Sequence, residues 1–490
     1  MSALTAERPI VAGRRAAASA PPAWLRERGM GASILVAAIS SAFGVVLIST
    51  TDYIAAFLRA DPFVGDSDTL AFVLSFLTVL LVGVAVYVAA IVTANTFATV
   101  IAGRTRRIAL LRLIGASARG QRAEVARQGL IVGALGAMLG LVGGTAIAAI
   151  GLGAADAAWG LSVPDFALVQ PVLLVPAVIV ALTTWAAAWA GSRRVLAVTP
   201  LQALGGAVEA SREQITARTG RNVGAAVLLV SGAALLAAGV AIGLVIPLGV
   251  IVAFVGGILS FTGLALGATL VMPPVLRLVG RLFGRSATAR LAAENALRYP
   301  ERSSRMAIGV VMGVTLVTMF AVAIESVKVL LTRAGGGSLP VELASVLDSF
   351  SAIMMGLVAV SAVIAGVGLV NLLTIGVVQR RRELGLLRAL GVSNAQVRRM
   401  VLLEAAHVTI AALGTGLVLG IAYGWAGAQS LLGSVRVDPD QTTSMTLVWP
   451  AVPPGPLVAV VAATTVLTLV AAVVPTRLAT RVAPVEALAE

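Results

Sequence analysis

The chain has 490 residues, of which 59% are hydrophobic and only 12% are charged, and its formal net charge is +14. Soluble domains contain about 45–50% apolar and about 25% charged residues, so this composition excludes a soluble globular domain and indicates a polytopic membrane protein. The chain has no cysteine and a single histidine, which excludes disulfide bonds and cysteine-ligated metal and leaves His407 unable to form a metal site alone.

Ten apolar runs along the chain are long enough to cross a membrane, because a hydrocarbon core about 30 Å thick requires about 20 residues of helix. They cover residues 31–57, 69–101, 129–154, 171–192, 223–245, 249–276, 306–327, 349–378, 403–430 and 454–476. The sequence therefore predicts an all-α polytopic membrane protein with about ten transmembrane helices arranged 4+2+4. The middle pair is separated only by Ile246-Pro-Leu-Gly249, which predicts a tight hairpin.

The positive charge is concentrated in alternate loops. Of the 36 Lys and Arg residues, 32 lie in 1–29, 103–127, 193–221, 277–305, 379–399 and 477–490. Cytoplasmic loops of membrane proteins carry an excess of Lys and Arg, so we expect these segments and both termini on the cytoplasmic side. The uneven distribution argues against nucleic-acid binding as the reason for the charge. A strong preference for arginine over lysine is typical of a high-GC bacterium, so the expected location is the bacterial plasma (inner) membrane.

One basic block occurs twice, 276 positions apart. The first copy reads Arg104-Thr-Arg-Arg-Ile-Ala-Leu-Leu-Arg-Leu-Ile-Gly-Ala-Ser117, and the second reads Arg380-Arg-Arg-Glu-Leu-Gly-Leu-Leu-Arg-Ala-Leu-Gly-Val-Ser393. The ends of the two copies align at Pro200 and Pro484, which are 284 apart, so the second copy has eight extra residues, most economically in the loop 431–452. Both copies have the same orientation, which predicts parallel repeats related by an axis along the membrane normal.

These signals divide the chain into four predicted parts. Residues 1–30 form a cytoplasmic tail with an interfacial helix, and 31–205 form the first four-helix repeat. Residues 206–285 form a cytoplasmic linker and the two-helix hairpin, and 286–490 form the second four-helix repeat. Short amphipathic helices are predicted on the inner interface at Trp24–Arg28 and Ala287–Arg298. The outer loops at 59–68 and 328–348 are too short for a large extracytoplasmic domain.

Each basic block predicts a short helix with an apolar face. Two leucines and an apolar residue lie on one side, a glycine follows at the position of a helix C-cap, and a serine can cap the next helix. The residues are Leu110, Leu111, Ile114, Gly115 and Ser117 in the first copy and Leu386, Leu387, Leu390, Gly391 and Ser393 in the second. The positive-inside rule alone would explain the arginines, but it does not explain the repetition of the Leu-Leu-Arg pattern in the same register. We therefore predict two docking surfaces for a cytoplasmic partner.

Asn95 and Asn371 form a second duplicated signal, again 276 positions apart. Each lies nine residues before the basic block and hence about 13 Å inside the membrane from it. An amide in hydrocarbon is costly unless it has a partner, so the preferred interpretation is a helix–helix hydrogen bond. Across the pseudo-twofold axis the two amides could act as a latch between the repeats. Direct contact with a substrate is the alternative.

The segment Arg381-Arg-Glu-Leu-Gly-Leu-Leu-Arg-Ala-Leu-Gly391 resembles the signature of the FtsX-like (MacB/LolE-type) ABC transporter permease family. Val370-Asn371, Val401-Leu-Leu-Glu404 and Pro484-Val-Glu-Ala-Leu488 match the same pattern, and the ten-helix layout is similar to that of antimicrobial-peptide resistance permeases. The resemblance implies a permease that pairs with a separate cytoplasmic ABC ATPase, whose grooves receive the helices that carry Leu-Leu-Arg. The residues so assigned to ATPase coupling are Leu110, Leu111, Arg112, Gly115, Glu383, Leu386, Leu387, Arg388 and Gly391.

The chain departs from the family pattern in two ways. The first copy has Arg107 and Gln128 where the second copy has Glu383 and Glu404, so the two halves are predicted to be unequal. Relatives also carry a large extracytoplasmic domain for which the outer loops of this chain leave no room. This weakens any transfer of peptide sensing or lipoprotein handling from the family.

Three classes of function compete. An ion-coupled transporter would need ionisable groups at membrane depth, and none lies in the middle of the ten runs. The chain also lacks a Gly-x-x-x-x-Gly-Lys-[Ser/Thr] motif, so we expect no ATPase activity and no cofactor in this chain, with ATP and Mg²⁺ bound by the partner. The favoured function is ATP-driven export or extraction of a hydrophobic or amphipathic substrate such as a lipid, lipopeptide, peptide or drug-like molecule. The alternative is a non-transporting mechanotransmission permease that relays ATPase motion to a cell-envelope partner.

One chain already contains both halves of such a permease, so we expect two ATPase copies for each chain. Membrane lipids and the hydrophobic substrate are the other expected partners.

Overall fold

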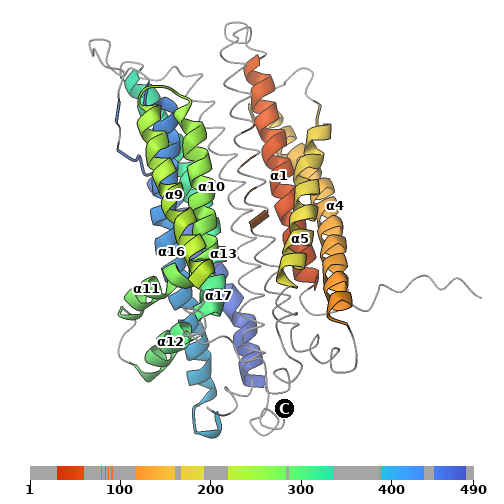
Figure 1. The fold of residues 1–490 in the computed structure, drawn as a ribbon, viewed down its shortest axis with the longest axis vertical. Coiled ribbons are helices and arrows are strands. Elements are labelled where there is room, and N and C mark those ends of the chain that lie inside the picture. The colour runs from red at the N-terminus through yellow and green to blue at the C-terminus, as the bar shows by residue number, and fades with distance from the viewer. Residues whose placement is uncertain are drawn as a thin grey trace, which may run out of the picture.

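The computed structural model describes residues 30–59, 117–159, 167–192, 219–282, 286–298, 300–334, 388–434, 446–447 and 449–481, together with positions 79, 83, 87, 90, 91, 337 and 386. All regular secondary structure within these residues is helical, as the sequence predicts. The helices are α1 (Met30–Arg59), α4 (Ala118–Trp159), η2 (Pro171–Leu173), α5 (Leu174–Gly191), α9 (Thr219–Gly243), α10 (Gly249–Leu266), α11 (Ala268–Gly280), α12 (Ala287–Arg298), α13 (Pro300–Ala334), α16 (Asn394–Leu432) and α17 (Pro454–Arg481). Figure 1 shows the long helices with their axes nearly parallel to one another, whatever the direction of the chain, and with α11 and α12 at one end.

Seven of the described helices are long and apolar enough to cross a membrane, and each coincides with a predicted run. They contain Ser33–Tyr53, Arg119–Ala154, Pro171–Ser192, Gly220–Gly243, Gly249–Leu266, Met306–Arg333 and Asn394–Leu432. The run predicted at 454–476 corresponds to α17, whose apolar stretch Pro454–Val470 is shorter. The runs 69–101 and 349–378 lie outside the described residues, apart from the single positions between 79 and 91.

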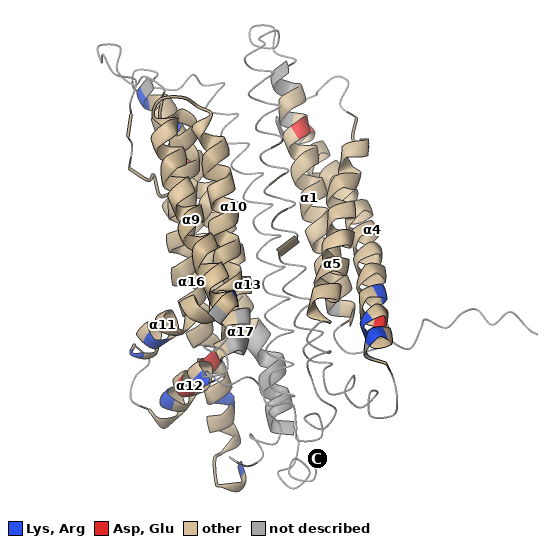
Figure 2. Cartoon of the chain, in the orientation of Figure 1, with Lys and Arg blue, Asp and Glu red and all other residues tan. Residues whose placement is uncertain are grey.

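Most charged side chains of the described helices lie near the helix ends. Figure 2 shows Lys and Arg mainly at the end that carries α11 and α12, while the middle of the long helices is uncharged. The helices α4 and α16 both begin at this same end (Figure 1), directly after Ser117 and Ser393. This arrangement is that of a multi-pass membrane protein with one strongly basic side.

The prediction of one continuous helix over 249–276 is wrong. The helix α10 ends at Leu266, Gly267 adopts φ −91° and ψ 12°, and α11 begins at Ala268. The residue Gly267 weakens the helix at this point, and Pro273 and Pro274 each remove a backbone N–H donor a turn later. The helix α11 then packs against α13 and α16, where Met272 and Leu276 are fully buried.

The first two described helices of each repeat cross at glycines in the same register. A Cβ atom on Gly140 of α4 would lie less than 3.0 Å from Ala38 of α1, and a Cβ atom on Gly416 of α16 would meet Val314 of α13 at 2.8 Å. Both partners in the second contact are 276 positions after those in the first. The next turn repeats this relation with the pairs Gly144–Ala42 and Gly420–Thr318. The duplicated sequence therefore has a duplicated helix crossing.

The last helix of each repeat also occupies an equivalent place. In the first repeat, a Cβ atom on Gly133 of α4 would lie 2.8 Å from Cβ of Thr184 in α5. In the second repeat, Oγ1 of Thr409 in α16 lies 3.0 Å from Oγ1 of Thr468 in α17. Thr409 lies 276 positions after Gly133, and Thr468 lies 284 positions after Thr184. The extra eight residues of the second repeat therefore lie between 409 and 468. The predicted loop 431–452 lies in this interval.

Candidate functional site

The structure describes only part of the predicted docking surfaces. Leu386, Arg388 and Gly391 of the second copy are described. The other predicted coupling residues are Leu110, Leu111, Arg112, Gly115, Glu383 and Leu387, and they lie outside the described residues. The predicted latch residues Asn95 and Asn371 lie outside them as well.

The described end of the second predicted docking helix, at Leu386 and residues 388–390, presents an apolar face. The backbone N–H of Leu390 donates to the carbonyl of Leu386 at 3.0 Å, which is the helical i to i−4 bond. Residues four apart share one face of a helix, so the two leucine side chains lie one above the other. Their exposed fractions are 46% for Leu386 and 82% for Leu390. Two leucines are therefore presented outward at the basic end of the protein.

The docking helix ends at Gly391, as the sequence predicts. Gly391 has φ +95°, in the left-handed region that glycine adopts without steric cost. Its N–H donates to the carbonyl of Arg388 at 3.0 Å, which closes the last turn. The left-handed residue turns the chain sharply, so the docking helix and α16 are separate elements with only Val392 and Ser393 between Gly391 and the start of α16 at Asn394.

The serines of both copies cap the following helices, which confirms that part of the prediction. Oγ of Ser393 accepts from the N–H of Gln396 at 3.2 Å, and the Gln396 side chain accepts from the N–H of Ser393 at 2.9 Å. This is a complete capping box. In the first copy, Oγ of Ser117 accepts from the N–H of Gly120 at 3.0 Å. Each duplicated block therefore fixes the point at which the next long helix begins.

The turn after the second docking helix rests on α12. Val392 packs against a small cluster of buried side chains at the start of α16, namely Val397, Met400 and Val401, which also includes Ala292 of α12. The buried residues of α12 are Ala289, Ala292 and Ala296, which lie on one face and allow α16 to approach closely. The predicted amphipathic helix at Ala287–Arg298 is thus present, and it supports the base of the docking turn.

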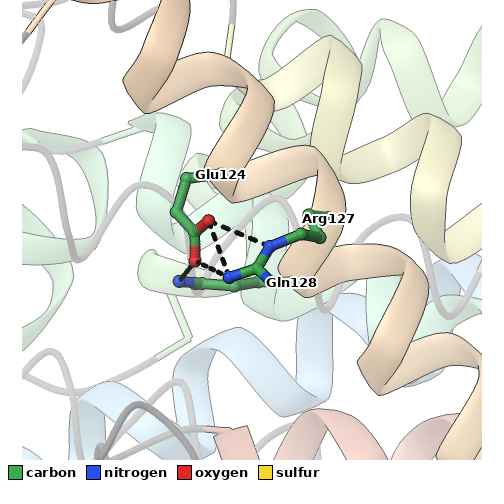
Figure 3. Close-up of polar contacts among 3 residues, drawn as sticks. All are labelled: Glu124, Arg127 and Gln128. Carbon is green, nitrogen blue, oxygen red and sulfur yellow. Dashed lines mark hydrogen bonds and ion pairs between the residues drawn. The ribbon is translucent and has the colours of Figure 1, made fainter.

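The two copies differ at one equivalent position, which is Gln128 in the first copy and Glu404 in the second. In the first copy, Gln128 and Arg127 both donate to the carboxylate of Glu124, at 2.9 Å and 3.0 Å respectively (Figure 3). In the second copy, Glu404 is only 3% exposed, so it cannot contact a cytoplasmic partner directly. One turn later, Nε2 of His407 lies 2.6 Å from the carbonyl oxygen of Leu276 in α11. Glu404 is therefore buried within the protein and does not belong to an accessible surface.

Tyrosines attach the middle hairpin to both repeats, which the sequence does not reveal. The Tyr87 hydroxyl donates to the carbonyl of Ile258 at 3.0 Å and lies 2.8 Å from Oγ1 of Thr262 in α10. The Tyr423 hydroxyl of α16 lies 2.9 Å from Oγ of Ser260. Both rings contact the ring of Phe261 edge-on, with centroids 6.4 Å and 6.3 Å away. One turn of α10 is therefore bonded to residues from both halves of the chain.

Comparison with known proteins agrees with the duplicated architecture. The FtsX-like permease C-terminal family matches residues 79–200 and again residues 355–484. The two matches begin 276 residues apart and end 284 residues apart, which are the offsets of the helix contacts described above.

The similarity to individual proteins covers a smaller part of the chain than the family match does. The chain is 30% identical over 139 residues to a probable export ATP-binding/permease protein of Pseudomonas fluorescens, which covers 28% of this chain and 19% of the relative. It is 30% identical over 138 residues to the macrolide export ATP-binding/permease protein MacB of Burkholderia thailandensis, with the same coverage. It is 34% identical over 73 residues to the ABC transporter permease YtrF of Bacillus subtilis, which covers 14% of this chain and 16% of the relative. The chain spans less than a fifth of the length of these relatives.

The two family matches together cover just over half of the chain, and they coincide with the duplicated helix packing. The protein therefore belongs to the FtsX-like permease family.

Proposed function

We propose that this protein is the permease subunit of an ABC transporter and that it couples ATP hydrolysis by a separate ATPase to export or extraction of a hydrophobic or amphipathic substrate. The relatives named above are described as export ATP-binding/permease proteins or as an ABC transporter permease. This sequence contains no P-loop motif, so ATP and Mg²⁺ would be bound by the partner chain. FtsX-like permease domains themselves have no ATPase activity.

The observation that carries the proposal is the exposed apolar end of the second docking helix. Leu386 and Leu390 are solvent-accessible leucines at the basic end of the protein, beyond the apolar part of α16. Burial of two leucine side chains in a partner's groove contributes roughly 3–6 kcal/mol before the costs of association. The left-handed Gly391 and the Ser393 cap give the helix a fixed direction relative to α16. A movement imposed on this helix would therefore reach the membrane through α16.

Two ATPase copies are proposed for each chain. The two family matches and the repeated helix crossings give one chain two equivalent halves, each with its own basic block. ABC ATPases act as pairs, so one permease chain would supply both docking helices. The basic ends of the helices, together with both termini, would face the cytoplasm.

A hydrophobic or amphipathic substrate is proposed because the described membrane surface offers mainly apolar contacts. The outward faces of α4 and α9 present side chains such as Leu139, Val142, Val227 and Val230. The charged groups of the described helices are mostly at the helix ends (Figure 2). A cargo that enters laterally from the bilayer suits these walls better than a sugar or an ion.

The experiment is reconstitution of this protein with a separate ABC ATPase subunit from the same bacterium. We expect Leu390→Asp to reduce recovery of the complex and permease-dependent ATP hydrolysis at least tenfold, because a charge enters the groove where a leucine was buried. Leu282→Asp is the matched control, since Leu282 is 78% exposed on the same basic side but lies outside the docking helix. If both variants bind and stimulate the ATPase like the wild type, Leu390 does not dock the ATPase. A complex with two permease chains for each ATPase pair would contradict the proposed stoichiometry.

A further inference from the structure

The guanidinium of Arg122 in α4 is stacked on the indole of Trp189 in α5. Its Cζ atom lies 4.3 Å from the ring centroid, which is a cation–π contact. Trp189 lies in the last turn of α5, and Trp185 lies one turn before it. Both indoles are about two-fifths exposed, so the stack lies at the surface where α4 and α5 leave the apolar part of the membrane.

The charge of Arg122 is not neutralised within the described part of the protein. Its Nε and Nη2 atoms are buried, and neither has a hydrogen-bond acceptor there. Arg122 as a whole is partly exposed, so the side chain is still accessible from the protein surface. A guanidinium keeps its positive charge at every physiological pH, and a partly buried charge is unfavourable without a counter-ion.

The nearest carboxylate along the helix already has partners. Glu124 accepts from Arg127 and Gln128, as Figure 3 shows. Residues two apart point to different sides of a helix, so Glu124 does not face Arg122. The exposed Arg119 lies one turn before Arg122 and adds a second cation to the same side of α4. The other acidic residue in the described part of α4 and α5 is Asp156, at the opposite end of α4, where it accepts from Tyr53.

The second repeat does not reproduce this arrangement. The position equivalent to Trp189 is Val473, so the aromatic platform is missing there. The position equivalent to Arg122 is Arg398, which is exposed on α16. A requirement of the shared fold would be expected in both repeats. The stack in the first repeat therefore needs an explanation of its own.

We propose that Arg122 and Trp189 form a binding site for the phosphate group of an inner-leaflet phospholipid. The phosphate accepts from the guanidinium of Arg122 and is attracted by Arg119, and the indoles of Trp185 and Trp189 contact the lipid below its headgroup. Tryptophan and arginine are suited to this depth, because each combines an apolar body with a group that stays at the membrane interface. An anionic lipid such as phosphatidylglycerol is favoured over a zwitterionic lipid, since the site has excess positive charge. This assignment does not depend on the proposed ATPase partner.

The test is native mass spectrometry of the purified full-length chain, titrated with phosphatidylglycerol and, in parallel, with phosphatidylcholine of the same acyl chains. We expect the wild type to retain one phosphatidylglycerol molecule more tightly than the others, and Arg122→Gln to weaken that binding about tenfold. Arg398→Gln is the matched control and should leave it unchanged. Trp189→Val, which copies the second repeat and keeps the charge, should weaken it severalfold. This variant keeps the test informative if Arg122→Gln does not fold.

Three results would overturn the proposal. The first is equal phosphatidylglycerol binding by Arg122→Gln, Trp189→Val and the wild type. The second is that millimolar inorganic phosphate displaces the tightly bound lipid, which would make the site one for a soluble anion. The third is that Arg122→Gln loses the ATPase but not the lipid, which would make Arg122 part of the protein interface.

Discussion

Thr409 and Thr468 join α16 to α17 through hydroxyl oxygens 3.0 Å apart, at the place where the first repeat brings Gly133 against Thr184. The two crossings occupy equivalent positions but use different interactions. The first relies on close approach of backbones, and the second on a hydrogen bond between side chains. The repeats therefore share their helix arrangement without sharing all of its chemistry.

This difference predicts unequal effects of valine at the two positions. Thr409→Val removes one interhelical hydrogen bond, which costs about 0.6 kcal/mol on average within a membrane. Gly133→Val adds three carbon atoms where Cβ alone would already lie 2.8 Å from Thr184, and such overpacking costs about 1–3 kcal/mol. Thermal unfolding of both variants in one detergent measures the difference. Equal midpoints would show that α4 and α5 can separate without cost.

The shared register of the glycine crossings predicts a matched pattern of sensitivity. Gly144→Leu and Gly420→Leu should each destabilise the protein by several kcal/mol, because the side chains would enter the backbones of α1 and α13. Gly143→Leu and Gly414→Leu are the controls, since nothing lies within 4 Å of a Cβ atom at either position. Unfolding midpoints should fall for the first pair only. A loss of stability in the controls would mean that helix propensity or lipid contact, and not packing, dominates.

The left-handed residue at the end of the docking helix predicts a local effect. Gly391→Ala places a Cβ atom at φ +95°, which costs about 1–2 kcal/mol. The turn that holds the docking helix should open more often, so backbone amides between 386 and 393 should exchange with solvent about tenfold faster. Hydrogen exchange read by mass spectrometry measures this, with Gly414→Ala as the control. Unchanged exchange in this segment would refute a stiff, glycine-dependent turn.

The tyrosines around α10 predict two independent attachments of the middle hairpin. Tyr423→Phe and Ser260→Ala each break the same hydrogen bond. The free energy of unfolding of the double variant should therefore equal that of the less stable single variant to within about 0.5 kcal/mol. Tyr87→Phe combined with Ser260→Ala should be additive, because Tyr87 bonds Ile258 and Thr262 instead. Thermal unfolding of the five variants completes both cycles. Additivity for Tyr423 and Ser260 would show that their hydroxyls do not interact.

Local features of the protein could be predicted from sequence with good accuracy. The helix caps at Ser117 and Ser393 and the helix end at Gly391 depend on interactions within a few residues, and all three are present as predicted. The amphipathic helix at Ala287–Arg298 likewise follows from its own periodicity. The coupling roles of Leu386, Arg388 and the other predicted residues stay predictions, since they depend on a second protein.

Contacts between distant segments could not be predicted in the same way. Hydropathy does not predict the break at Gly267, because the run 249–276 is apolar throughout. The difference between Gln128 and Glu404 is visible in the sequence, but the burial of Glu404 depends on how α16 packs against other helices. The Tyr87 and Tyr423 bonds to α10 depend on which helix faces meet, and nothing in the surrounding apolar sequence marks them.

The amino-acid sequence is enough to predict the seven long apolar helices that the structure describes, the repetition at offsets of 276 and 284, and the helix end at Gly391. These follow from the cost of placing polar groups in hydrocarbon and from bonds between near neighbours. Three features emerge only from the packing of the helices: which side of each helix faces another helix, the stack of Arg122 on Trp189, and the bonds from one turn of α10 to both repeats. Lipid tails are as apolar as leucine, so hydrophobicity cannot distinguish a helix face that contacts lipid from one that contacts protein.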